Sequence, residues 1–147
     1  MHTSSANTLH ELLQGMDSTC RKLEDVVLGE QKAVREFDTA ALIRLTDVRH
    51  TCQQELQNME IACRDIVRHH TAPDELSLES FIDVYLQDSA PKLQSLRRKL
   101  YQRLANLSQS NEDNRLRLRA AYDVTSSVLQ NIGIQAAKNT YGPGGEL

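Results

Sequence analysis

Side chains with the chemistry for catalysis or metal binding are few in this chain, and their spacing does not support a site. Phosphate-binding loops of the GxxxxGK type do not occur, nor do GxSxG or HExxH motifs. The nearest approach to a metal motif is Asp47-x-x-His50, but a di-iron bundle needs inward carboxylates from all four helices. The last long helical segment offers only Glu112 and Asp113 in its central half. The sequence therefore predicts no enzyme activity, no cofactor and no metal site.

The three cysteines are Cys20, Cys52 and Cys63. The last two fall in one predicted helix about 16 Å apart, which is well beyond the ~7 Å limit on the Cα separation of a disulfide. They also lack the close CxxC spacing of a structural zinc site. All three occupy apolar positions of the helical pattern, so we interpret them as reduced core residues.

Four polar residues interrupt helical patterns that are otherwise apolar: Glu30, Arg49, Asn111 and Asn114. In an antiparallel pair of helices, the residue numbers of two facing residues always add up to the same value. For the first two helices a value of 79 pairs apolar residues with apolar residues, and it places Glu30 opposite Arg49. If the last helix runs back alongside the second, Asn111 lies beside Arg49. A buried polar network must be mutually hydrogen-bonded. We therefore predict one structural polar layer that sets the register, and we favour this role over partner contact for the two asparagines.

These residues must be positioned by helices, because apolar residues recur at steps of three or four through most of the chain. We expect an all-α fold: an antiparallel helical hairpin plus a short helix and one long C-terminal helix, forming an elongated coiled-coil-like bundle. Asp38 is the expected N-cap of the second helix. The bundle should span 1–138, and 139–147 should form a flexible C-terminal tail. The expected helices cover about 5–36, 39–70, 78–87 and 91–132, with a possible extension of the last to 137.

The tip of the hairpin follows from the same pattern. The first apolar seam runs to Phe37, which we expect to face Leu42 at the start of the second helix. Gly15 and Gly29 lie off this seam and should each cost the helix about 1 kcal/mol.

Composition restricts the class of protein. Aromatic residues make up 4% of the chain and tryptophan is absent, so the large side chains that often line ligand pockets are scarce. The longest apolar run, 40–43, is too short for a signal sequence or a membrane span, and we expect a cytosolic protein.

Charge is unevenly distributed. The stretch from Lys92 to Arg119 contains eight basic residues and only two acidic ones, whereas the rest of the chain has more acidic than basic residues. A nucleic-acid-binding helical module is therefore one alternative, which would use Arg97, Arg98, Arg103, Arg115, Arg117 and Arg119. We favour a basic face that complements the acidic helices before it, because Tyr101 is the only aromatic residue among these arginines.

The predicted alignment of the last helix with the hairpin also leaves part of that helix without a neighbour. The hairpin tip at Asp38 should be level with about Tyr122. Beyond that point an apolar stripe has no partner within the chain, and such a stripe indicates an interaction with another protein. A structural or regulatory coiled-coil protein would instead self-associate through this stripe. The stripe consists of Val124, Val128, Leu129, Ile132 and Ala136.

Four features of the sequence together match one known family. They are the block Leu9, Leu12 and Leu13, the residues Glu30, Asp38, Leu42, Leu45 and Arg49 of the hairpin, the segment 107–114 with its two asparagines, and the Tyr-Gly-x-x-Gly tail at 141–145. Through them the chain resembles, over nearly its whole length, the FlgN-type flagellar export chaperones. Arg49 stands where that family usually has lysine, and the stretch 115–118 is more basic than usual.

This resemblance implies a cytosolic, non-enzymatic chaperone that holds hook–filament junction proteins and delivers them to the flagellar type III export gate. In the family the tail tyrosine contacts the export-gate membrane protein, and here it matches Tyr141, followed by Gly142. A functionless terminus is an equally weighted alternative for this tyrosine. In the family the client docks on the C-terminal helical region, which together with the unpartnered stripe gives the predicted client-binding residues Leu118, Tyr122, Val124, Val128, Leu129, Ile132 and Ala136.

Overall fold

The computed structural model describes residues 2–70 and 76–132, and every regular element in these ranges is helical. The all-α class is therefore confirmed. Small differences from the expected bounds occur at helix ends: the first helix begins three residues earlier, and the short helix ends at Tyr85 because a 3-10 turn, η1, precedes the last helix. The predicted tail, 139–147, and the predicted extension to 137 lie outside the described residues. The elements are α1 (His2–Arg35), α2 (Thr39–His70), α3 (Leu78–Tyr85), η1 (Gln87–Ser89) and α4 (Ala90–Ile132).

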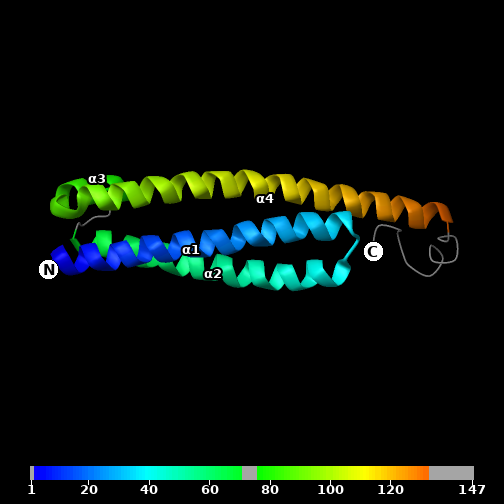
Figure 1. The fold of residues 1–147 in the computed structure, drawn as a ribbon, viewed down its shortest axis with the longest axis horizontal. Helices are drawn as coiled ribbons and strands as arrows, with labels where there is room; N and C mark the ends of the chain where they lie inside the picture. Colours follow the sequence, from blue (N-terminus) through cyan, green and yellow to red (C-terminus); the bar gives the residue numbers. More distant parts are fainter. Residues whose placement is uncertain (1, 71–75, 133–147) are drawn as a thin grey trace.

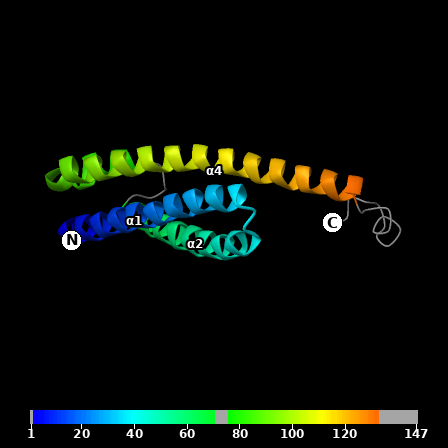
Figure 2. The same cartoon turned by 45° about the vertical axis from the view of Figure 1, so that its right-hand side comes forward.

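The three long helices form an elongated bundle in which α1 has α2 on one side and α4 on the other (Figures 1 and 2). Helices α1 and α2 make the antiparallel hairpin, and α4 runs in the direction of α1. We expected α4 to lie alongside the second helix. It does run antiparallel to α2, but α1 supplies most of its contacts, and α2 and α4 touch only sparsely.

The short helix α3 closes the end of the bundle that holds the N-terminus (Figure 1). Its first turn is capped by Ser77, whose Oγ accepts a hydrogen bond from the Ser80 backbone N–H at 3.1 Å. Phe81 and Ile82 are fully buried against the long helices. Burial of two large side chains explains why an eight-residue helix is stable here, since such a short helix is marginal by itself.

The hairpin turn differs from the expected arrangement at Phe37. This residue lies outside both helices, has a φ of 54°, and is 78% exposed, so the prediction that it packs in the seam opposite Leu42 was wrong. The reason is the helix end: the Asp38 N–H bonds to the Ala33 carbonyl at 2.8 Å and the Phe37 N–H bonds to Val34. This pattern requires a left-handed residue at Phe37. Asp38 then caps α2, as expected, because its Oδ1 accepts a hydrogen bond from the Ala41 backbone N–H at 3.0 Å.

Gly15 and Gly29 are points of close approach between α1 and α2. A Cβ at Gly15 would lie 2.8 Å from Met59 Sδ, and one at Gly29 would lie 3.0 Å from Leu45 Cδ1. The sequence pattern placed both glycines off the seam. Both glycines face α2, so the surface of α1 that contacts α2 is wider than the single heptad seam. The helix-propensity cost of the glycines is thus offset by tighter packing.

Candidate partner-binding site

The four predicted layer residues lie together and join all three long helices. The Arg49 guanidinium on α2 binds the Glu30 carboxylate of α1 through two hydrogen bonds, Nε to Oε2 at 3.0 Å and Nη2 to Oε1 at 2.5 Å. Arg49 Nη1 also donates to Asn111 Oδ1 on α4 at 2.8 Å. Asn114 Nδ2 donates to Glu30 Oε1 at 3.1 Å and to the Val27 carbonyl at 3.0 Å.

Burial makes this layer energetically important. Glu30 is 4% exposed and Asn114 is 3% exposed, while the Arg49 side chain is 19% exposed. A buried carboxylate without a partner is strongly destabilising, whereas this one accepts bonds from a guanidinium and an amide. The contacts thus tie one axial position of α4 to one position of the hairpin. That the layer sets the register remains a prediction.

A second polar contact between α1 and α4 was not anticipated from the sequence. Arg103 on α4 donates to Asp17 Oδ1 at 2.7 Å and to the two carboxylate oxygens of Glu24 at 2.8 and 2.9 Å. The hydrogen bonds to Glu24 and then Asp17 raise the pKa of Arg103 above its ordinary value. The available signal was the seven-residue spacing of the two acids, which places them on one face of α1.

The contacts also show where the hairpin ends along α4. Because Asn114 is level with Val27 and Glu30, an offset of 84 to 87 residues relates α4 to α1. Arg35, the last residue of α1, is therefore level with about 119–122. The α4 backbone remains helical to Ile132, and Figures 1 and 2 show its end passing the α1–α2 turn. About the last ten residues of α4, which we call the projecting segment (123–132), have no hairpin alongside.

The predicted client-binding and gate-contact residues divide into three groups. Leu118 is half-buried on α4, close to the end of the hairpin. Tyr122 lies at the level where the hairpin ends, and four further residues lie on the helical backbone of the projecting segment: Val124, Val128, Leu129 and Ile132. Ala136, Tyr141 and Gly142 lie outside the described residues. The roles of all these residues stay predictions.

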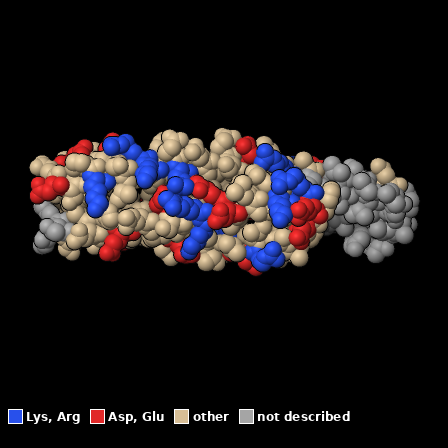
Figure 3. Space-filling model, viewed as in Figure 1, with Lys and Arg blue, Asp and Glu red and all other residues tan. Residues whose placement is uncertain are grey.

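Several arginines of α4 have acidic or amide partners within the chain. Arg97 donates to Glu79 at 3.0 Å, and Arg115 donates to Glu112 at 2.8 Å. The hydrogen bond from Arg115 lowers the pKa of Glu112 and raises that of Arg115. On the face shown in Figure 3, basic side chains are interspersed with acidic ones along the bundle. Arg97 and Arg103 thus pair with acidic residues of helices that precede α4, as we expected, whereas Arg115 pairs within α4.

The cysteines lie in the interior, and all three are free. Burial, followed by the nearby carboxylates, raises the pKa of the Cys20 thiol to about 11, and burial also raises that of Cys63 to about 11. Thiols with such pKa values stay protonated at neutral pH and are poor nucleophiles and metal ligands. Over 2–70 and 76–132, no group of three or more potential metal-ligating side chains comes together.

The fold and the contacts define an elongated, all-helical bundle in which a long helix passes the end of a helical hairpin. A family model described as FlgN protein matches residues 1–147, the whole chain. The chain therefore belongs to the FlgN family, a family of flagellar export chaperones. No match was found among curated proteins or among solved structures. Among the helices as far as they are described, none is long and apolar enough to cross a membrane.

Proposed function

We propose that this protein is a cytoplasmic chaperone that binds hook–filament junction proteins through the C-terminal region of α4 and delivers them to the type III export gate. The observation that carries the proposal is the extension of α4 past the α1–α2 turn (Figures 1 and 2). Among the described residues, the hairpin does not lie alongside the projecting segment, and an apolar stripe in such a position is typical of a surface that binds another protein. Membership of the FlgN family supplies the class of partner.

The delivery step is assigned to the tail that follows α4. Tyr141 and Gly142 match the family's gate-contact tyrosine and the glycine after it. A tail beyond the client-binding helix can contact the export-gate membrane protein while the client stays bound. Binding of client and gate would then use separate parts of the chain, so truncations can separate them.

The test compares three chains as bait in pull-downs: the full chain, a chain ending at Lys138 and a chain ending at Arg119. We expect the full chain and the Lys138 variant to retain the junction protein of the same bacterium. We expect the Arg119 variant to lose it, because the projecting segment is removed. With the purified export-gate membrane protein in detergent, the Lys138 variant and full-length Tyr141→Ala should both lose binding.

All variants should keep their helical circular dichroism, because the polar layer and the core lie before Arg119. Retention of the junction protein by the Arg119 variant would contradict the assignment to the projecting segment. Recovery of nucleic acid by every bait would favour the nucleic-acid-binding alternative. Recovery of the bait alone would favour the structural coiled-coil alternative.

A further inference from the structure

Phe37 in the α1–α2 turn combines two features that the stability of the chain alone does not favour. Its φ of 54° lies in the left-handed region, where glycine is preferred because a Cβ is sterically unfavourable there. Its ring is more exposed than any other large apolar side chain in the described part of the chain. Residues held in such backbone conformations cluster at sites that bind ligands or partners. Phe37 is therefore a candidate for contact with a partner.

The turn that carries Phe37 is held by hydrogen bonds on both sides of this residue. The backbone N–H groups of Phe37 and Asp38 donate to carbonyls in the last turns of α1, and the Asp38 carboxylate caps α2. The turn is level with about 119–122 of α4, which is where the projecting segment begins (Figures 1 and 2). The exposed ring thus lies at the axial level at which the proposed client site starts.

The side of α4 that faces the hairpin continues into the projecting segment. Asn111 and Asn114 mark this side, because they bond to Arg49 of α2 and to α1. Leu129 and Ile132 follow these asparagines by eighteen residues, which is five full turns of an α-helix. Their positions on the helical backbone are therefore on the same side of α4. Both residues belong to the predicted client-binding stripe, so that stripe extends the hairpin-facing side beyond the turn.

This arrangement restricts where a partner of the projecting segment can lie. The hairpin occupies this side of α4 as far as the turn. A client segment that covers the same side beyond the turn therefore lies in line with the hairpin, and its near end faces the turn. The turn comprises 36–38, and Phe37 is its apolar side chain, while Glu36 and Asp38 are acidic. An apolar group at the near end of the client segment thus has one apolar side chain of the turn to pack against.

We propose that Phe37 is a second contact for the client: the client segment bound along the projecting segment lies in line with the hairpin, and an apolar side chain at its near end packs on the Phe37 ring. The inference rests on the proposed chaperone function and extends the client site from α4 to the α1–α2 turn. Aromatic rings that become buried on binding often contribute much of the binding energy of an interface. The contact accounts for an exposed aromatic ring at a position where glycine would stabilise the turn.

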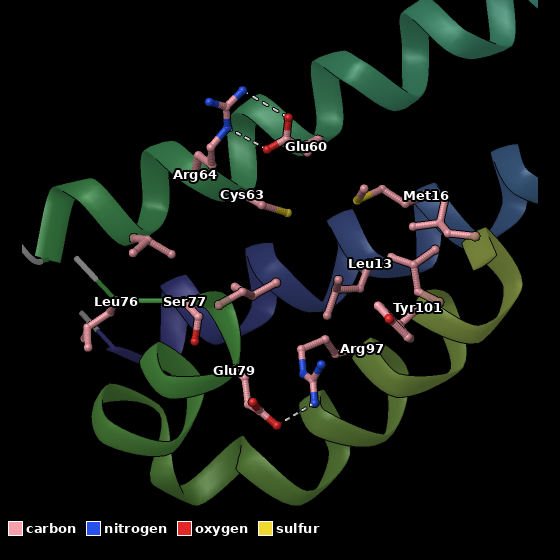
Figure 4. A pocket seen from close by; sticks show the side chains of 14 residues that line it. Leu13, Met16, Glu60, Cys63, Arg64, Leu76, Ser77, Glu79, Arg97 and Tyr101 are labelled. Carbon is pink, nitrogen blue, oxygen red and sulfur yellow. Dashed lines mark hydrogen bonds and ion pairs between the residues drawn. The ribbon is translucent and has the colours of Figure 1, made fainter. Parts of the chain in front are cut away.

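The experiment measures binding of the full chain to the purified, intact junction protein of the same bacterium by isothermal titration calorimetry. Phe37→Ala should weaken binding by about tenfold or more, because the ring is lost, whereas Phe37→Leu should weaken it by only about threefold or less. The matched control is Tyr101→Ala, which should leave the affinity within about twofold. Tyr101 is also an exposed aromatic residue, at 69%, but it lies on α4 in the half of the bundle that α3 closes (Figure 4).

Phe37→Gly separates binding from stability. This variant should bind the client as weakly as Phe37→Ala although its melting temperature is not lowered, because glycine is favoured at a positive φ. Circular dichroism spectra of all Phe37 and Tyr101 variants should match that of the unmodified chain. Equal weakening of binding by Phe37→Ala and Tyr101→Ala would contradict a specific contact at the turn.

A further full-length variant, Leu129→Glu, addresses the projecting segment and should abolish binding of the junction protein. If Leu129→Glu loses the client but the Phe37 variants do not, the proposal for Phe37 is wrong and the chaperone proposal stands. If the junction protein does not bind the unmodified chain, both proposals fail. A photo-crosslinking amino acid in place of Phe37 should capture the junction protein, and the same group in place of Tyr101 should not. Capture of a second copy of this chain alone at Phe37 would overturn the proposal.

Discussion

At the scale of single residues, Glu30 has the most demanding environment, because its carboxylate is 4% exposed and bonded to Arg49 and Asn114. We predict that Glu30→Ala lowers the free energy of unfolding by about 3 kcal/mol, since Arg49 would be left without its charged partner. Urea denaturation followed by circular dichroism measures this change.

The matched control for this prediction is Glu112→Ala. Glu112 also binds an arginine through two hydrogen bonds, but both side chains of the pair are more than half exposed. Exposed pairs contribute about 0–1 kcal/mol. Equal, small effects of Glu30→Ala and Glu112→Ala would contradict a stabilising role for the buried layer.

The residues of the polar layer could be predicted from the sequence because their helices have regular, long repeats. The register that pairs apolar residues along the α1–α2 hairpin also places Glu30 opposite Arg49. The direction of α4 then places Asn111 beside Arg49. The contact of Arg103 with Asp17 and Glu24 could not be predicted in the same way. Acidic residues are common on exposed helix faces, and periodicity alone does not say which of them a distant arginine reaches.

At the scale of elements, the α1–α2 turn is held by a non-glycine residue in a left-handed conformation. We predict that Phe37→Gly raises the free energy of unfolding by about 1 kcal/mol, because glycine adopts a positive φ without the steric cost that other residues have. The side chain is 78% exposed, so little packing is lost. Phe37→Ala is the control: it removes the same ring but keeps Cβ, and should not stabilise the protein. Stabilisation of the same size by both variants would show that the exposed ring, and not the backbone, is responsible.

The elements themselves were largely predictable, but their ends and their neighbours were not. The periodic pattern continued through Phe37, while backbone hydrogen bonds from Phe37 and Asp38 end α1 before it. The apolar pattern of each helix also indicated only one neighbouring helix for it to pack against. Only the packing shows that α1 is shared by α2 and α4.

At the scale of the whole molecule, the structure predicts a boundary within one continuous helix. Amide hydrogen exchange should be slow in α4 up to about residue 118 and should become at least about tenfold faster over 123–132, because isolated helical segments of this length open readily in water. Mass spectrometry of peptic peptides from the full chain can measure both regions. Addition of the junction protein should slow exchange over 123–132 if the proposed client site is right. Uniform protection along α4 in the free protein would contradict the boundary.

The buried polar layer also bears on how far α4 extends past the α1–α2 turn. Asn114 and Asn111 attach α4 to the hairpin at a single axial position, and the turn after α1 lies at a set distance from that position. If α4 slipped by one heptad along α1, its free end would extend about 10 Å more or less beyond the turn. Such a slip would separate Glu30 from Asn114 by two helical turns. If this layer sets the register, as we predict, its hydrogen bonds determine how far the projecting segment extends beyond the turn.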